Sequence, residues 1–125
     1  MSIVGVGIDV VGTERMEALL SAHGDRFLAR CFRSFDSSGT EAQSADPVEI
    51  AGLWAAKEAF LKALGADVSG IPYRDIEIIR EGSDAGTIRV HGKAREILAR
   101  AGARSIHLSM GQDGGLSVAT VILEN

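Results

Sequence analysis

Apolar and polar positions alternate along the amino-terminal segment of the chain. Residues 3–11 read IVGVGIDVV, in which β-branched residues alternate with glycine or aspartate. A period of two is typical of a strand with one buried face. We therefore predict a strand over residues 3–11 that buries its Val and Ile side chains. Asp9 is then expected on the other face, beside Gly5 and Gly7.

Two short helices are predicted next, and both carry arginine. Thr13 is a suitable N-cap for the first helix, which Gly24 ends. Asp25 can cap the second, which runs to about Phe32. The composition then changes to Ser, Gly, Thr, Gln and Asp without apolar periodicity. This change predicts a mobile loop over residues 34–45.

The strongest local signals in the chain delimit a long helix. Asp46 can cap it, Pro47 suits the first helical position, and Glu49 can reach back to the cap. Gly65 is a suitable stop. The predicted apolar side of this helix comprises Ile50, Leu53, Trp54, Leu61 and Leu64.

The remaining pattern predicts four strands and one more helix. The strands are expected over residues 75–80, 87–90, 105–110 and 116–123, and the helix over residues 93–100, ended by Gly102. Turns are expected over residues 82–86 and 112–115, the latter containing an Asp-Gly pair. The order β-α-α-α-β-β-α-β-β predicts one α+β domain over residues 1–125. In this fold a small antiparallel sheet packs against the long central helix.

Composition restricts the classes of protein to consider. The chain has 125 residues, 46% of them apolar, which suits a single domain with its own core. A net charge of −4 argues against a nucleic-acid partner, and no apolar run approaches the roughly 20 residues of a membrane span. The single cysteine, Cys31, with no apparent secretory leader, predicts a cytoplasmic protein with a packed thiol.

Glu58 and Lys62 are the first candidates for chemistry. They are four residues apart, so they share a helix face, with Ala51 and Ala55 on nearly the same line. One interpretation is a surface ion pair worth about 0.3 to 0.5 kcal/mol. The alternative is a ligand site, for which the small residues leave room. Asp9 would add a second carboxylate, and two carboxylates with a lysine suit Mg²⁺ and a phosphate ester.

Two motifs carry a resemblance to a known family. The segment GVGIDVV (residues 5–11) resembles the amino-terminal signature of the holo-acyl-carrier-protein synthases, and WAAKEAFLKALG (residues 54–65) resembles their second signature. Two shorter matches follow in the same order, DIEI (residues 75–78) and IHLS (residues 106–109). The similarity thus spans nearly the whole chain and implies a 4′-phosphopantetheinyl transferase fold.

The resemblance implies an enzyme that uses Mg²⁺. It would transfer the 4′-phosphopantetheine moiety of coenzyme A to a serine of an apo acyl carrier protein, releasing adenosine 3′,5′-bisphosphate. The implied catalytic residues are Asp9, Glu58 and Lys62, with Asp9 and Glu58 as the metal ligands. The implied coenzyme A site comprises Lys62, Gly65, His107 and Ser109. From its sequence context alone, His107 could equally be a packed strand residue.

The resemblance also implies two protein partners. One is the acidic carrier, which would dock on the helix that carries Arg15. The spacing of Arg26, Arg30 and Arg33 predicts that they line one side of a helix, so Arg15, Arg26 and Arg30 are the expected carrier-binding residues. A solvated helix face is the alternative reading of these arginines. The other partner is the chain itself, because family members this short form homotrimers with coenzyme A between adjacent subunits.

The sequence departs from the family pattern at three places. Leu53 stands where arginine is common, Gly111 and Gln112 replace polar residues of the last signature, and the usual T-x-x-E is absent from residues 34–37. These departures leave a second hypothesis open. In it the chain is a weakly active or inactive module that binds coenzyme A or the carrier.

Overall fold

The predicted order of elements is confirmed. The computed structural model describes residues 1–33, 41, 45–65, 69–79 and 86–125. The elements are β1 (Ile3–Gly12), α1 (Thr13–Cys31), α2 (Pro47–Leu64), a 3₁₀ turn η1 (Tyr73–Asp75), β2 (Ile76–Ile79), β3 (Thr87–Val90), α3 (Gly92–Arg100), β4 (Ser105–Asp113) and β5 (Leu116–Glu124). Most of the predicted loop over residues 34–45, and of the turn over residues 82–86, lies outside the described residues.

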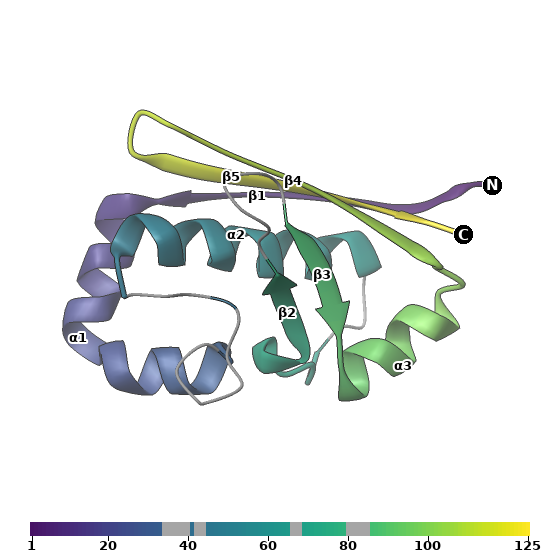
Figure 1. The fold of residues 1–125 in the computed structure, drawn as a ribbon, viewed down its shortest axis with the longest axis horizontal. Helices are drawn as coiled ribbons and strands as arrows, with labels where there is room; N and C mark the ends of the chain where they lie inside the picture. The colour runs from purple at the N-terminus through teal and green to yellow at the C-terminus, as the bar shows by residue number, and fades with distance from the viewer. Residues whose placement is uncertain (34–40, 42–44, 66–68, 80–85) are drawn as a thin grey trace.

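The predicted α+β class is also confirmed, with two antiparallel sheets in place of one. The first has the strand order β1-β5-β4, and the second pairs β2 with β3. Helix α2 lies along one face of the three-stranded sheet, while most of α1, β2, β3 and α3 lies below the level of α2 (Figure 1). The long helix is therefore central.

Helix α2 begins and ends where the sequence predicts. The Asp46 side chain accepts a hydrogen bond from the Val48 backbone N–H at 3.1 Å, and Gly65 takes a φ of 90° just after the last turn. The prediction that the small residues of α2 leave room for a ligand is wrong, however. Ala51 and Ala55 are fully buried, because α2 packs closely on β1 and β5, so they leave no space for a ligand.

The predicted orientation of β1 is reversed. A Cβ atom on Gly5 would lie 1.9 Å from the Ala63 carbonyl oxygen, and one on Gly7 would lie 2.0 Å from that of Ala59. The glycine face of β1 therefore lies directly on the α2 backbone, and Asp9 belongs to this inner face. The apolar face that periodicity assigns to the core points outward, and Ile8 is 57% exposed there.

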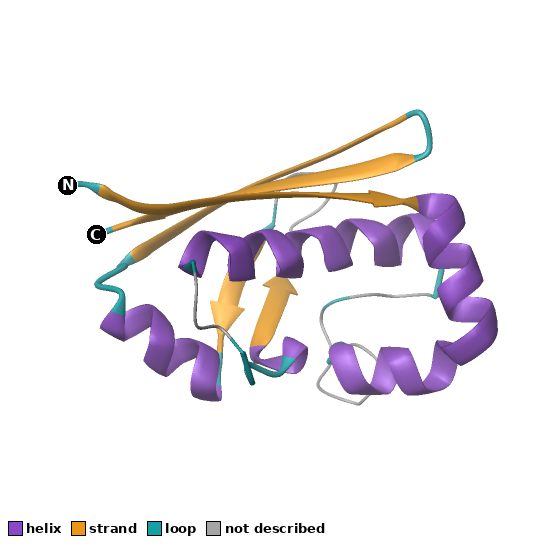
Figure 2. Ribbon diagram, turned by 180° about the vertical axis from the view of Figure 1, so that it is seen from behind, coloured by secondary structure: helices purple, strands orange, loops and turns teal. Residues whose placement is uncertain are grey.

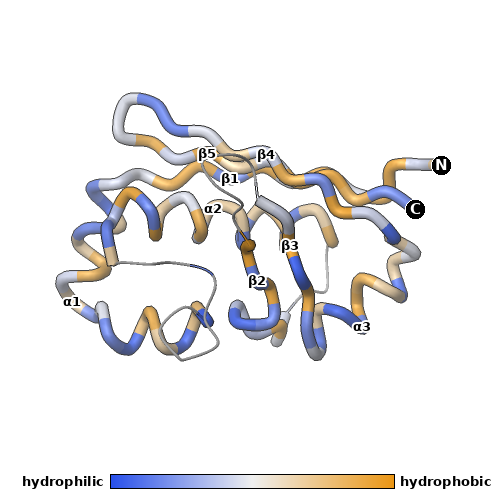
Figure 3. Tube along the Cα trace, viewed as in Figure 1, coloured by the Kyte–Doolittle hydropathy of each residue, from blue (hydrophilic) through white to orange (hydrophobic). Residues whose placement is uncertain are grey.

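The outer face of the three-stranded sheet is uncovered, and it is mainly apolar along β1 and β5. No described element packs over it in either view (Figures 1 and 2), and apolar residues follow its strands (Figure 3). We define the outer sheet face by Val6, Ile8 and Val10 of β1 together with their β5 partners Ile122, Thr120 and Val118. Its three β1 side chains are half exposed or more, at 57%, 57% and 50%.

Helix α1 contains the break predicted between two short helices. His23 has non-helical angles (φ −140°, ψ 22°), so the element consists of two arms that diverge in Figure 1. Gly12, not Thr13, takes the N-cap position, and no side chain caps the helix. Cys31 is buried as expected, and burial raises the pKa of its thiol.

The closing hairpin is longer than predicted. Strand β4 continues through Gln112 to Asp113, and the turn is made by Gly114 and Gly115, with φ values of 57° and 78°. Two consecutive positive φ angles suit a tight hairpin turn and favour glycine at both positions.

Within the described residues, no helix combines the length and apolarity that crossing a membrane requires.

The close approach of β1 to α2 predicts a strong effect of a single methyl group. We expect Gly7→Ala to lower the free energy of unfolding by about 3 kcal/mol, at the upper end of overpacking penalties, because the added carbon meets a backbone oxygen. The matched control is Gly24→Ala, where an added Cβ would have no atom within 4 Å apart from its chain neighbours and the nearby helix backbone. Urea unfolding followed by circular dichroism measures both. Equal stability of the two variants would contradict the packing described.

Candidate active site

The inner face of β1 brings Asp9 to helix α2. Lys62 Nζ lies 2.7 Å from Asp9 Oδ1, in an ion pair whose side chains are 54% and 15% exposed respectively. The hydrogen bond to Asp9, together with the charges of Asp9 and Glu58, raises the pKa of Lys62. Lys62 thus stays charged and lies within the electrostatic influence of both carboxylates. Of the three candidate residues, Asp9 and Lys62 are in direct contact, and Glu58 lies one helical turn before Lys62 on α2.

Glu58 has a partner that the sequence did not indicate. The Tyr73 hydroxyl donates a hydrogen bond to Glu58 Oε1 at 2.9 Å. Burial, and then the hydrogen bond to Glu58, raise the pKa of Tyr73. The phenol therefore remains a neutral donor at physiological pH. Tyr73 carries no motif, and its only sequence signal is its place just before the matched DIEI segment.

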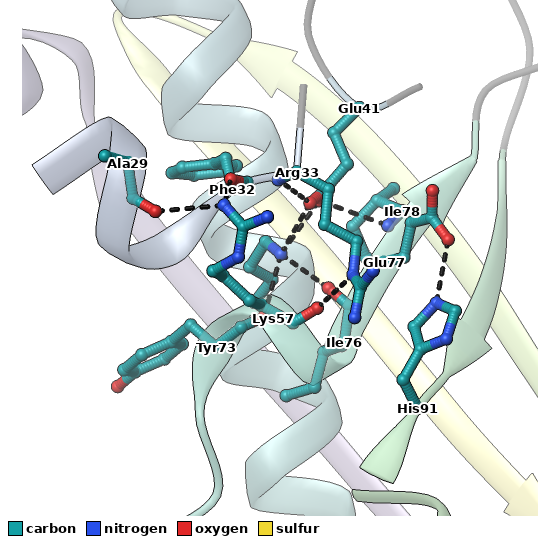
Figure 4. Close-up of polar contacts among 11 residues, drawn as sticks. Ala29, Phe32, Arg33, Glu41, Lys57, Tyr73, Ile76, Glu77, Ile78 and His91 are labelled. Atoms are coloured by element: carbon teal, nitrogen blue, oxygen red, sulfur yellow. Dashed lines mark hydrogen bonds and ion pairs between the residues drawn. The ribbon is translucent and has the colours of Figure 1, made fainter. Parts of the chain in front are cut away.

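A second polar cluster lies between α2, η1 and the start of β2. Lys57 is fully buried, and its Nζ lies 2.8 Å from Glu41 Oε2 (Figure 4). The same ammonium donates to the Tyr73 carbonyl oxygen at 2.9 Å and to that of Ile76. Burial lowers the pKa of Lys57, and the charge of Glu41 opposes that effect. Because a buried charge is tolerated only when paired, this cluster fixes β2 and η1 against α2.

Sequence reasoning missed this buried pair, although one signal was available. Lys57 falls in the apolar stripe of α2 between Leu53 and Phe60, where a lysine requires a buried partner. Glu41 also accepts hydrogen bonds from the backbone N–H groups of Arg33 (2.9 Å) and Ile78 (3.2 Å). A carboxylate is therefore present a few residues beyond the segment that lacks T-x-x-E.

The remaining predicted coenzyme A residues divide into two groups. Gly65 follows the last turn of α2, shortly after Lys62. His107 and Ser109 instead lie on the outer sheet side of β4, beside Ile122 and Thr120 of β5. Asp9 lies on the inner side, so the single chain does not bring His107 and Ser109 to the Asp9 carboxylate. His107 Nε2 lies 3.1 Å from Glu124 Oε1.

The departures near the end of β4 have different structural consequences. Gly111 is exposed on the same side as His107 and Ser109, where its lack of a side chain removes a polar group. The Gln112 amide donates to the Val48 carbonyl oxygen (3.2 Å) and to Ser117 Oγ (3.3 Å). Gln112 thus ties the hairpin to the start of α2.

The predicted carrier-binding arginines are exposed on α1. Arg15 belongs to the first arm, whereas Arg26 and Arg30 belong to the second arm, one turn apart. The expectation that Arg33 extends this row is wrong, because the helix ends before it. Arg33 Nε donates to the Arg74 carbonyl oxygen at 2.6 Å, and the Arg74 guanidinium donates to the carbonyl oxygens of Ala29 in α1 and of Phe32 just after the helix.

The donor set fits a magnesium ion that shares its ligands with a substrate. Among the described residues, no group of three or more His, Cys, Asp or Glu side chains could enclose a metal. Asp9 and Glu58 offer two carboxylates beside an exposed ammonium. Mg²⁺ typically takes one or two carboxylates, several waters and substrate phosphates. The arrangement therefore suits a metal bound together with a phosphate ester.

Comparison with known proteins identifies the class. The family described as the 4′-phosphopantetheinyl transferase superfamily matches residues 5–121, and the chain belongs to this superfamily. A holo-[acyl-carrier-protein] synthase of Anaeromyxobacter dehalogenans is 36% identical over 98% of this chain and 96% of its own. The synthase of Vibrio atlanticus is 35% identical over the full length of both chains. The resemblance stated from the motifs is confirmed.

Solved structures agree with this assignment. The holo-[acyl-carrier-protein] synthase of Neisseria meningitidis superposes with a TM-score of 0.83 at 28% identity, covering 99% of this chain and all of its own. The Helicobacter pylori synthase, solved in complex with coenzyme A, gives a TM-score of 0.77 at 26% identity over 95% of this chain and 99% of its own. The predicted fold is thereby confirmed.

Proposed function

We propose that this chain transfers the 4′-phosphopantetheine moiety of coenzyme A to a serine of an apo acyl carrier protein. The serine oxygen attacks the β-phosphorus of coenzyme A, the bond to the adenosine bisphosphate breaks, and the serine proton passes to a base. The observation that carries the proposal is the contact between Asp9 and Lys62, one turn along α2 from Glu58, in a chain of this superfamily.

Asp9 and Glu58 are the proposed ligands of Mg²⁺. When bound, the ion supplies charge neutralisation at the pyrophosphate oxygens of coenzyme A. Glu58 is half buried and held by Tyr73, which suits a carboxylate that must keep one orientation. Glu58 is also the proposed acceptor of the serine proton, directly or through a water.

Lys62 is the proposed phosphate-binding residue. Its ammonium is paired with Asp9, yet its side chain is 54% exposed at the end of a flexible stem. It can therefore exchange one negative partner for another without burial of a charge. Contact with the departing phosphate would offset the charge that develops there. The nearby Gly65 leaves the C-terminal end of α2 free of a side chain.

Loss of either carboxylate should abolish transfer. We expect Asp9→Ala and Glu58→Ala each to lower the Mg²⁺-dependent rate by at least about 100-fold, because each change leaves Mg²⁺ with only one of its two proposed protein ligands. The matched control is Glu96→Ala, which removes an exposed carboxylate of α3. The measurement is the intact mass of the apo carrier after incubation with coenzyme A and Mg²⁺.

The same assay separates the enzyme from the binding module. Wild-type protein should add the mass of one phosphopantetheinyl group to the carrier. Binding of coenzyme A with no mass gain would favour the module, and wild-type rates in Asp9→Ala or Glu58→Ala would refute the assigned ligands. Thermal unfolding of each variant checks that the fold is kept.

We further propose a homotrimer built through the outer sheet face. This apolar surface is uncovered in the single chain, and patches of this kind mark protein interfaces. His107 and Ser109 border it and are separated by the sheet from Asp9 of their own subunit. A neighbouring subunit that packs there would be able to place its coenzyme A beside them. Closed threefold symmetry is the state implied by the resemblance.

Charge on the outer sheet face should separate the subunits. We expect Ile8→Glu to yield monomers with little transferase activity, because the carboxylate would be buried unpaired in the interface. Val48→Glu changes a residue on α2 that is 39% exposed and should leave the assembly intact. Light scattering after size exclusion, with the transfer assay on each fraction, makes the comparison. A fully active wild-type monomer would contradict the proposal.

The exposed arginines of α1 are the proposed docking site for the carrier. Arg26 and Arg30 are one helical turn apart, and Arg15 extends the positive surface onto the first arm, in a chain of net charge −4. An acidic carrier would be steered to such a surface.

Action in the cytoplasm, expected from the single cysteine, stays a prediction.

Reversing these charges should weaken carrier use selectively. We expect Arg15→Glu with Arg30→Glu to raise the KM for the carrier about tenfold or more at low salt, and less at high salt because charge steering is screened. The charge-matched control is Arg95→Glu with Arg100→Glu on α3, where both arginines are exposed. Initial rates against carrier concentration at two ionic strengths give the answer. An unchanged KM at low salt would place docking elsewhere.

A further inference from the structure

Tyr73 is held at three separate points. Its hydroxyl donates to Glu58 Oε1 at 2.9 Å, and its carbonyl oxygen accepts from Lys57 Nζ at 2.9 Å. Its ring packs on Trp54, with centroids 4.4 Å apart and planes inclined at 34°. A side chain with both its backbone and its ring fixed has little freedom left, so the direction of its hydroxyl is set by the fold.

The two helix residues that hold Tyr73 are consecutive. Lys57 points to the buried side of α2, where Glu41 fixes its ammonium at 2.8 Å. Glu58 points to the half-buried side that also carries Lys62. Lys57 thus holds the 3₁₀ turn through the Tyr73 carbonyl oxygen, and the Tyr73 hydroxyl donates a hydrogen bond to Glu58, the next residue of the helix. The buried pair is thereby connected to the proposed metal ligand through a single tyrosine.

We infer that Tyr73 is a positioning residue, whose hydroxyl holds one oxygen of Glu58 so that the other stays available to the metal. This inference rests on the proposed function, because it takes Glu58 as a ligand. Among the described residues, the structure gives Glu58 no other hydrogen-bond partner. A free carboxylate on a helix would sample several rotamers, and metal binding would have to order it. Mutation of residues that orient metal ligands in this way commonly lowers metal affinity or activity by about 10- to 100-fold.

The test compares Mg²⁺ affinity in variants that keep the ring or the fold. Tyr73→Phe removes only the hydroxyl and retains packing on Trp54. Ser117→Ala, which removes a buried hydroxyl from β5, is the matched control. Glu58→Gln tests the ligand role itself. For each protein, calorimetry gives coenzyme A binding as a function of Mg²⁺, and also without metal.

We expect Tyr73→Phe to raise the Mg²⁺ concentration needed for half-maximal binding by about tenfold, with metal-free binding unchanged. Ser117→Ala should match the wild type, and Glu58→Gln should lose the Mg²⁺ dependence. A Tyr73→Phe titration within about twofold of wild type overturns the inference alone, as does a loss that is equal with and without metal. A wild-type titration for Glu58→Gln overturns the proposed ligand and the inference with it.

Discussion

The contact between β1 and α2 is the constraint on which the rest of this structure depends. Gly5 and Gly7 have no side chain, so the strand reaches the helix backbone at Ala63 and Ala59. Asp9 follows these glycines on the same inner face, so its carboxylate is directed at α2. There it lies 2.7 Å from Lys62 Nζ. The same closeness turns the larger side chains of β1 outward, which leaves the apolar outer sheet face. The candidate site and the candidate interface between subunits therefore have one physical origin.

Helix α2 connects the core to the site through residues that face different ways. Lys57 enters the core and is neutralised by Glu41, while Glu58 and Lys62 lie on the more exposed side. Burying Lys57 is costly unless its pair is complete, so the cluster specifies one position for η1. That position sets Tyr73 against Glu58. The buried side of the site is thus held by an ion pair, and the exposed side carries a lysine that is half accessible to solvent.

Much of the fold followed from signals that are local in sequence. Asp46, Pro47 and Gly65 act through neighbouring backbone groups, so the limits of α2 were predictable, as were the break near His23 and the closing hairpin. The buried face of β1 was not, because periodicity distinguishes two faces without saying which one meets a helix. Glycine on the inner face reads as an exposed position unless close packing is considered. The partners of Lys57 and Glu58 come from distant segments, and no local pattern encodes them. The resemblance implied Asp9 and Glu58 at the metal and His107 at coenzyme A, and the chain places His107 on the opposite face of the sheet from Asp9.

The most direct test of the account is the location of the metal. Mn²⁺ accepts the same oxygen ligands as Mg²⁺ and scatters anomalously, so crystals grown with coenzyme A and Mn²⁺ would show its position. The account predicts an anomalous peak in contact with the carboxylates of both Asp9 and Glu58, with a coenzyme A phosphate completing the site. Coenzyme A bound with the metal at another place, or bound beside Lys62 with no metal between the two carboxylates, would contradict it.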